Sequence, residues 1–174
     1  MLVLKTFDEK NYTEDMPVYT KYAVRAVIIR DGKIATQKAK SGYYKILGGG
    51  VDTGESYEDA LVREVREESG LVVKPESINL IGEIVEKRQD LFNKEYVYEC
   101  HSIFYFCDVE EKLVDTNLTA SEIREGFELE WEEPQSVIEA NERIFKVADD
   151  KKKPWVERDT YFIKQLVSDS YLNK

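Results

Sequence analysis

Cysteine and histidine are scarce in this chain of 174 residues, which has 2 cysteines and 1 histidine. Cys100 and Cys107 stand an odd number of positions apart in one expected strand, so their side chains should point to opposite faces and form no disulfide. Thiols without a disulfide framework are typical of the reducing cytoplasm, where we expect the protein. A single histidine leaves no Cys–His or His–His pair at ligand spacing, which argues against zinc. We expect that residue, His101, in the core or at its rim, with a general-base role as the alternative.

Long apolar runs are missing too, since no stretch approaches the roughly 20 apolar residues of a transmembrane helix. The opening run MLVLKTFDEK turns charged too early for a secretory signal, so we expect neither a signal nor a membrane partner. Basic residues are outnumbered by acidic ones, 25 to 35, which gives a formal net charge of −10. That charge disfavours non-specific binding to nucleic acid. Walker A and dinucleotide-binding glycine motifs are also absent.

What is present suits one folded domain. The chain is 42% hydrophobic, and a protein of this length buries roughly 70% of its unfolded surface. We expect an N-terminal extension over residues 1–20, the main domain over 21–145, and a connector and helix packed on that domain over 146–174. A homodimer is the commonest assembly among soluble oligomers and is our expectation for the quaternary state.

Strands and helices are expected to alternate. The expected strands are residues 3–7, 22–29, 33–38, 43–47, 78–85, 96–109 and 127–132. The expected helices follow the glycine run at 48–50, run from Pro134 to Arg143, and span residues 155–172. Asp31–Gly32 predicts a tight hairpin, Thr53 or Ser56 a helix cap, and Gly70 a helix end. Residues 109–126 are expected to form a mobile acidic loop and 148–154 a charged connector. This mixture predicts an α/β sandwich.

An acidic helix face carries the chemistry. Glu64, Glu67 and Glu68 fall within an arc of roughly 100° on a helix of 3.6 residues per turn. Like charges at this spacing cost a few tenths of a kcal/mol each unless a cation neutralises them. Mg²⁺ takes carboxylate oxygens together with substrate phosphates. The run REVREE alone would also fit a solvated surface helix, and it is the wider spacing that favours a site.

That spacing reads G-x5-E-x7-R-E-V-x-E-E-x-G-L and runs from Gly49 to Leu71. It resembles the signature of the Nudix (MutT-like) hydrolases, without a gap or a substitution. The resemblance covers roughly residues 22–140 and implies an α/β/α sandwich with a mixed sheet. One departure precedes the motif, because Leu47 stands where many members have proline and lacks its fixed φ.

The resemblance also implies an activity and a set of roles. The activity is Mg²⁺-dependent hydrolysis, with Mn²⁺ as the alternative ion, of a nucleoside diphosphate linked to another moiety. Glu67 and Glu68 would bind the metal, Glu64 would bind it or orient the attacking water, and a backbone carbonyl near Gly48 would join the shell. A further catalytic acid stands outside the motif in this family. Glu125 is the first candidate for it and Glu122 the second.

Four other motif positions have structural roles in our interpretation. Gly49 and Gly70 serve the backbone. Arg63 can pair with Glu55 or with Glu67 and so fix the loop onto the helix, which we favour over direct catalysis.

The substrate is less well indicated. No proline or tyrosine stands between Val85 and Asp90, where ADP-ribose and diadenosine polyphosphate hydrolases respectively would carry one, and the NADH and coenzyme A motifs are absent. We therefore expect a small nucleotide-type substrate, a nucleoside triphosphate first. ADP-ribose or nucleotide-sugar hydrolysis is the alternative, as is a nucleotide-sensing module without turnover; a purely structural protein is disfavoured. Candidate substrate contacts are Arg25, Tyr44, Arg88 and Tyr98, each of which could instead form a surface ion pair or pack in the core.

Overall fold

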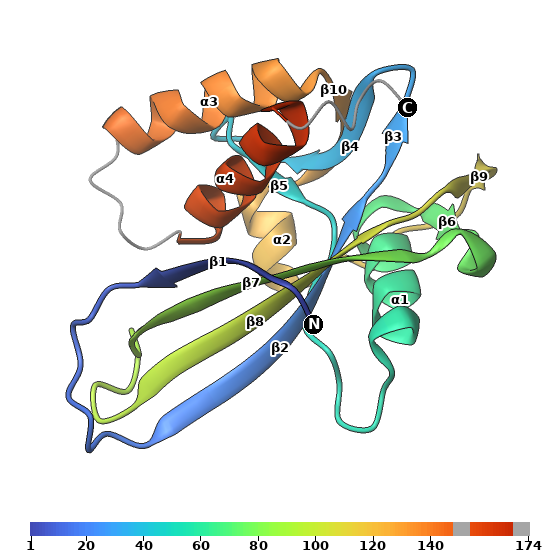
Figure 1. Ribbon diagram of the computed structural model, residues 1–174. Coiled ribbons are helices and arrows are strands. Elements are labelled where there is room, and N and C mark those ends of the chain that lie inside the picture. Colours follow the sequence, from blue (N-terminus) through green and yellow to red (C-terminus); the bar gives the residue numbers. More distant parts are fainter. Residues whose placement is uncertain (148–153, 169–174) are drawn as a thin grey trace.

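The computed structural model describes residues 1–147 and 154–168, in which the strands form three sheets. The longest strands make a four-stranded sheet in the order β1-β7-β8-β2 (Figure 1). Their bounds are Val3–Asp8 for β1, Asn79–Gln89 for β7, Val97–Phe106 for β8 and Val18–Val27 for β2. The sheet is mixed, because β1 runs parallel to β7 and β2 parallel to β8, whereas β7 and β8 are antiparallel.

The other two sheets are smaller. The first joins β10 (Glu128–Glu132), β4 (Lys33–Lys38) and β3 (Ile29–Arg30), and β5 (Tyr44–Ile46) also pairs with β4. The second joins β6 (Leu71–Val73) to β9 (Val109–Leu113). Asp31 and Gly32 have φ values of 51° and 74° between β3 and β4, which confirms the predicted hairpin.

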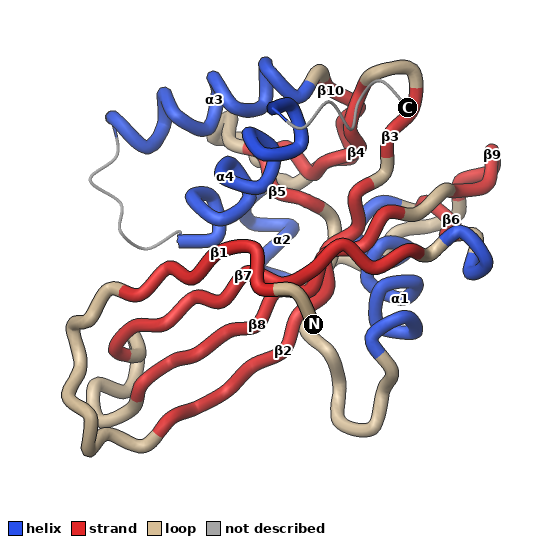
Figure 2. Tube along the Cα trace, viewed as in Figure 1, coloured by secondary structure: helices blue, strands red, loops and turns tan. Residues whose placement is uncertain are grey.

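Helices cover opposite sides of the sheets (Figure 2). Helix α1 (Tyr57–Ser69) lies on one side, and α3 (Pro134–Val147) and α4 (Pro154–Ser168) lie on the other. The α/β/α sandwich with a mixed sheet is therefore confirmed. No helix in the described part of the chain is long and apolar enough to cross a membrane. The expected connector and the end of the terminal helix fall mostly outside the described residues.

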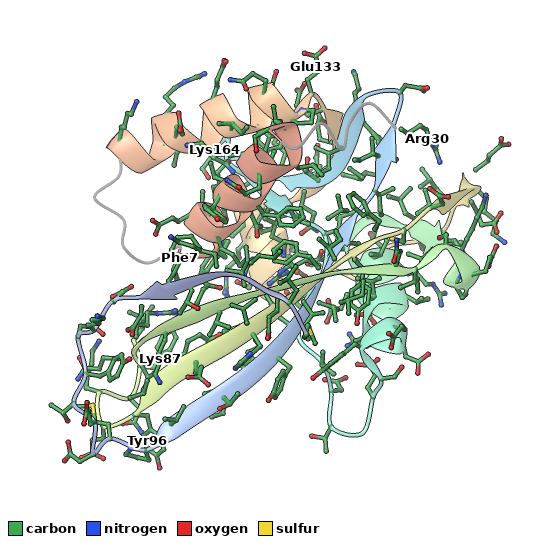
Figure 3. All side chains as sticks on the ribbon, in the orientation of Figure 1. Phe7, Arg30, Lys87, Tyr96, Glu133 and Lys164 are labelled. Atoms are coloured by element: carbon green, nitrogen blue, oxygen red, sulfur yellow. The ribbon has the colours of Figure 1, made fainter. Side chains whose placement is uncertain are left out.

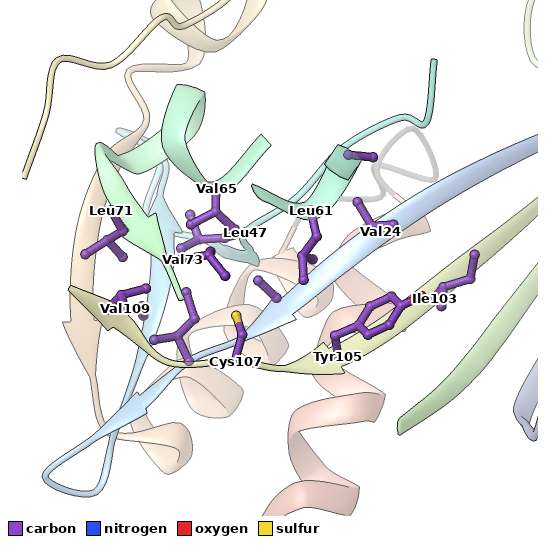
Figure 4. Close-up of a cluster of buried hydrophobic side chains, with 14 residues drawn as sticks. Val24, Leu47, Leu61, Val65, Leu71, Val73, Ile103, Tyr105, Cys107 and Val109 are labelled. Atoms are coloured by element: carbon purple, nitrogen blue, oxygen red, sulfur yellow. The ribbon is translucent and has the colours of Figure 1, made fainter. Parts of the chain in front are cut away.

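Two hydrophobic clusters hold these layers together. Val65 and Leu61 of α1 are fully buried against Val24 and Leu47, as the helical spacing predicts (Figure 4). On the opposite side, Phe104 of β8 stacks on Phe162 of α4 with ring centroids 4.1 Å apart. Strand β8 thus has apolar contacts on both faces where it passes between the helices. Both cysteines are free and buried.

Local sequence fixes the two ends of α1. The Ser56 hydroxyl accepts the Asp59 N–H at 3.1 Å, so Ser56 rather than Thr53 is the cap. Gly70 ends the helix with φ 73°, and a Cβ there would lie 2.2 Å from the Val114 carbonyl oxygen. Only glycine therefore serves at this stop.

One expectation is wrong: residues 109–126 are not a continuous loop. They contain β9 and a short helix, α2 (Ala120–Glu125). Helix α2 begins in a reciprocal cap between Thr119 and Glu122 and ends at Gly126, whose φ is 65°. The run T-A-S-E at residues 119–122 has the capping-box pattern that starts a helix, although the acidic residues around it are typical of a loop.

Candidate functional site

A cleft of about 720 Å³ opens between the glycine loop and one face of the large sheet. Its walls come from the loop at residues 48–50, from α1, from α2 and from the start of α4. Its floor is the face of β2, β7 and β8 that carries Lys21, Arg88 and Tyr98. These strands extend beyond the helices, as the positions of Lys87 and Tyr96 show (Figure 3). The sheet thus gives the cleft a long open end.

Glu68 lies at the closed end of this cleft and is only 3% exposed. Its carboxylate accepts the Gly48 N–H at 2.7 Å and pairs with the Lys45 ammonium at 2.6 Å. Burial raises the pKa of Glu68 to about 7, against the lowering by Lys45 and the Gly48 N–H. Lys45 also reaches Glu122 of α2 at 3.5 Å, so one ammonium links both helices.

Glu64 reaches the cleft because Gly49 has no side chain. A Cβ on Gly49 would lie 2.3 Å from a Glu64 carboxylate oxygen. The other carboxylate oxygen accepts from Arg63 at 2.8 Å. Any residue larger than glycine at position 49 would therefore displace Glu64.

Arg63 ties the glycine loop to α1. Two of its nitrogens donate to the two oxygens of Glu55 at 2.8 Å each, and one of them also donates to the Gly50 carbonyl at 2.9 Å. Its distance to Glu67 is 3.5 Å, so both expected ion pairs are present. Hydrogen bonds from Arg63 lower the pKa of Glu55 to about 2.

Glu67 faces away from the cleft. Its side chain is 37% exposed and lines a separate hollow of about 480 Å³ with Asp115 and Asn117. The helical spacing explains this split, since Glu67 lies on the Arg63 side of Glu64 and Glu68 on the other.

The Gly48 carbonyl is already a hydrogen-bond acceptor in this structure. The Arg25 guanidinium donates to it from β2, while the buried Arg25 Nε has no partner among the described residues. Arg25 lines the cleft close to Glu68. A cation at this carbonyl would therefore meet the positive charge of Arg25.

The residues nonetheless fit a hard divalent cation. Among the described residues no three His, Cys, Asp or Glu side chains are already gathered as a ligand cluster. Glu64 and Glu68 offer carboxylate oxygens to one cleft. Oxygen donors of this kind suit Mg²⁺ or Mn²⁺ better than softer metals.

Glu125 lines the same cleft from the end of α2. The Tyr43 hydroxyl donates to it at 3.1 Å. Tyr44, by contrast, does not line the cleft and is 4% exposed in the core beneath α3 and α4. Alternation along the strand decides this, because Tyr43 and Lys45 face the cleft whereas Tyr44 and Ile46 face the core.

At the open end, the structure brings together Arg88, Tyr98 and Tyr19. The Arg88 guanidinium lies 4.5 Å from the centre of the Tyr98 ring, and Tyr19 and Tyr98 have ring centroids 6.2 Å apart. Sequence reasoning selected the first two and missed Tyr19, which register alone places beside Tyr98. It also missed Lys45 and Arg158, which no local motif marks.

His101 lies on the opposite face of the sheet from the cleft. Its ring nitrogens lie 2.8 Å from Glu83 and 3.3 Å from Glu99, and the ring stacks on Tyr22. Desolvation lowers the pKa of His101, but its two carboxylate partners outweigh this and raise it. The rim position expected for His101 is confirmed.

Known proteins share parts of this sequence and fold. An ADP-ribose pyrophosphatase of Methanocaldococcus jannaschii is 36% identical over 80 residues, covering 44% of this chain and 46% of the relative. A CTP pyrophosphohydrolase of Escherichia coli K12 is 39% identical over 71 residues, covering 38% of this chain and 48% of the relative. The chain thus matches about half the length of these curated relatives.

A solved NUDIX hydrolase from Nitrosomonas europaea has the same fold. Its TM-score is 0.54 at 20% identity, over 70% of this chain and 78% of that one. The family model for the NUDIX domain matches residues 20–156, which include the whole Gly49–Leu71 motif and most of the cleft. The chain therefore belongs to the NUDIX domain family.

Proposed function

We propose that the protein is a divalent-metal-dependent hydrolase that cleaves a nucleoside diphosphate linked to another moiety. A nucleoside triphosphate is the substrate we put first. The observation that carries this proposal is the meeting of Glu64 and Glu68 with the glycine loop at the closed end of one cleft. The family membership and the activities for which the two curated relatives are named support it.

The cleft also offers basic side chains to an anionic substrate. Its lining contains the cations Lys21, Arg25, Lys45, Arg88 and Arg158 beside the carboxylates Glu64, Glu68, Glu86, Asp90, Glu122 and Glu125. Basic side chains of a cleft can contact phosphates directly, and a metal ion held by the carboxylates would reverse the sign of their charge towards an anion.

In the proposed reaction, water attacks one phosphorus of the pyrophosphate and the bridging P–O bond breaks. The leaving phosphate takes the electron pair of that bond, and the Glu125 carboxylate accepts the proton from the water. Tyr43 holds Glu125 through the 3.1 Å hydrogen bond. Glu64 and Glu68 would hold Mg²⁺ or Mn²⁺, whereas Glu67 lines the separate hollow. Such an ion, when bound, withdraws charge from phosphorus and lowers the pKa of a bound water.

A substrate panel tests the proposal. Nucleoside triphosphates, ADP-ribose and nucleotide sugars are incubated with the protein in Mg²⁺, in Mn²⁺ and in EDTA, and phosphate-containing products are measured. We expect hydrolysis that EDTA abolishes and that Glu68→Gln lowers by at least about 100-fold. Hydrolysis that persists in EDTA would contradict the metal dependence.

ADP-ribose is the second candidate substrate, because one curated relative bears the name ADP-ribose pyrophosphatase. Faster turnover of ADP-ribose than of any triphosphate would favour it. Tight binding of nucleotides without product across the panel would instead favour a nucleotide-sensing module. Under either outcome, millimolar Mg²⁺ with a non-hydrolysable nucleotide should raise the Tm measured in a calorimetric melt, because a ligand that binds only the native state stabilises that state.

A further inference from the structure

Arg88 is a nearly buried cation that forms no ion pair with a described residue. It is 9% exposed, its Nε has no hydrogen-bond partner, and no ion pair or hydrogen bond joins it to another described residue. The carboxylates on either side of it in sequence are engaged elsewhere. Glu86 pairs with Arg158 at 3.0 Å, and Asp90 accepts the backbone N–H groups of Phe92 and Asn93. The Asn93 N–H and, to a lesser extent, the charge of Arg88 lower the pKa of Asp90, but no hydrogen bond or ion pair joins Arg88 to Asp90 among the described residues. A buried charge left in this state is costly unless a ligand completes its hydrogen bonds.

The surroundings of Arg88 are flat and aromatic. Strand register aligns Arg88 with Tyr98, and Tyr98 with Tyr19, across one face of the sheet. We call these three residues the Arg88 row. Phe92, on the loop between β7 and β8, also lines this end of the cleft and is 97% exposed. Planar groups of this kind provide stacking surfaces for a planar ligand.

The distance from the Arg88 row to the glycine loop matches a nucleotide. Ala23 of β2 bridges to Gly50, and Tyr19 lies four residues earlier on the same strand. At roughly 3.3 Å per residue, the two points are about 13 Å apart. An extended nucleoside diphosphate has a comparable reach from its base to its terminal phosphate.

The chemistry of the guanidinium restricts the base. Arg88 lies over the Tyr98 ring, so its N–H groups, which lie in the guanidinium plane, remain available at the edge of the stack. Two parallel N–H groups require two adjacent acceptors. Guanine offers O6 and N7, and cytosine offers O2 and N3, whereas adenine and uracil place a donor beside each acceptor on these edges.

We propose that the Arg88 row is the base-binding subsite and that Arg88 selects guanine or cytosine nucleotides over adenine and uracil nucleotides. This inference rests on the proposed function for the presence of a nucleotide. It narrows the substrate class, because it disfavours ADP-ribose and uridine nucleotide sugars. The base lies against Tyr19 while its two acceptors meet Arg88.

Binding of non-hydrolysable analogues tests the proposal. Titration calorimetry in Mg²⁺ measures Kd for the α,β-methylene triphosphates of guanosine, cytidine, adenosine and uridine, and for tripolyphosphate. We expect a guanine or cytosine analogue to bind at least roughly tenfold tighter than the adenine and uracil analogues. Arg88→Lys keeps the charge but loses the fork, so it should remove this preference and leave the Kd of tripolyphosphate unchanged.

Two further variants keep the test decisive. Tyr19→Ala alters a residue that is 55% exposed, so the variant should fold. It should weaken the binding of all four nucleotide analogues but not the binding of tripolyphosphate. Lys87→Gln is the matched control, since Lys87 faces the other side of the sheet and pairs with Glu99. It should change none of the five Kd values.

Three results would overturn the inference: no base preference in the wild type, equal weakening of all ligands including tripolyphosphate by Arg88→Lys, or no effect of Tyr19→Ala. Hydrolysis without base preference would contradict this inference alone and leave the proposed function intact. The protein could instead show no turnover and yet have a base preference that Arg88→Lys abolishes. That result would support the base-binding subsite and contradict the proposed hydrolase activity.

Discussion

Single residues decide how the carboxylates of Glu64 and Glu68 are stabilised in the cleft. Glu68 is enclosed and held by Lys45 and the Gly48 N–H, and Glu64 fits because position 49 has no side chain. Arg63 neutralises Glu64 by pairing with one of its carboxylate oxygens. The like-charge repulsion expected along α1 is therefore offset by cations of the protein itself. Any metal ion that binds Glu68 has to compete with the Lys45 ammonium.

Glu125→Gln tests the proposed base at this scale. The amide cannot accept a proton but still accepts the Tyr43 hydrogen bond, so kcat should fall by about 100-fold or more while Tm changes little. A phosphate-release assay and a thermal melt measure the two quantities. Glu128→Gln, an exposed neighbour on β10, is the control and should turn over normally. Unchanged turnover of the Glu125 variant would remove Glu125 from the mechanism.

His101 gives the stability a pH dependence. Because its folded pKa is raised above 6.5, the native state binds the proton more tightly than the unfolded state does. The resulting stabilisation is complete below about pH 6.5 and is lost as the pH rises through the folded pKa. Unfolding free energies of the wild type and His101→Gln should therefore converge as pH rises from 6 to 9. Parallel curves would contradict the raised pKa.

At the scale of elements, the glycine loop and α1 act as one unit. The bidentate pair between Arg63 and Glu55 and the bond to the Gly50 carbonyl join both ends of the loop to one helical residue. Helix α2 is attached differently, through Lys45 and its own cap at Thr119. The loop is thus held by side chains within the motif, whereas α2 is held by a residue outside it.

Arg63→Lys should loosen that unit. Lysine keeps the charge but cannot form the parallel bonds to Glu55, so we expect a loss of about 1 to 2 kcal/mol in the free energy of unfolding. Urea denaturation at pH 7 measures it. Arg66→Lys, on the exposed side of the same helix, is the matched control and should lie within about 0.5 kcal/mol of the wild type. Equal losses in the two variants would show that the pairing with Glu55 contributes nothing specific.

For the whole molecule, a buried ionic network joins the last described helix to the sheets. Arg158 of α4 binds Glu86 of β7 and Ser102 of β8 at 3.0 Å each and Asp159 at 2.8 Å. Asp159 in turn accepts the Ile46 N–H of β5 at 2.9 Å. One helix end therefore links two sheets, and it does so directly beneath the cleft.

Arg158→Met should destabilise the fold by about 3 to 5 kcal/mol, because it leaves two buried carboxylates without a cation. Adding Glu86→Gln should recover part of the loss. Lys164→Met on the same helix removes an ion pair with Glu142 that is nearly half exposed, and should cost less than about 1 kcal/mol. Chemical denaturation compares the three variants with the wild type. A loss for Arg158→Met as small as that for Lys164→Met would refute the network.

Local sequence by itself determined the features that depend on neighbours along the chain. Helical periodicity predicted the buried apolar side of α1, Asp31–Gly32 predicted a hairpin, and Gly70 predicted a helix stop. Each of these follows from backbone geometry within a few residues. The family motif was readable for the same reason, since it is one continuous segment from the glycine loop through α1 to Leu71.

Only the tertiary structure decided which distant side chains meet. Tyr43 rather than Tyr44 reaches the cleft because of the phase of β5. Lys45 meets Glu68, Arg158 meets Glu86, and Tyr19 meets Tyr98 through strand pairing and helix docking between segments far apart in sequence. Register and packing set these contacts, and no local pattern encodes them, because a shift of one residue in a strand exchanges its two faces.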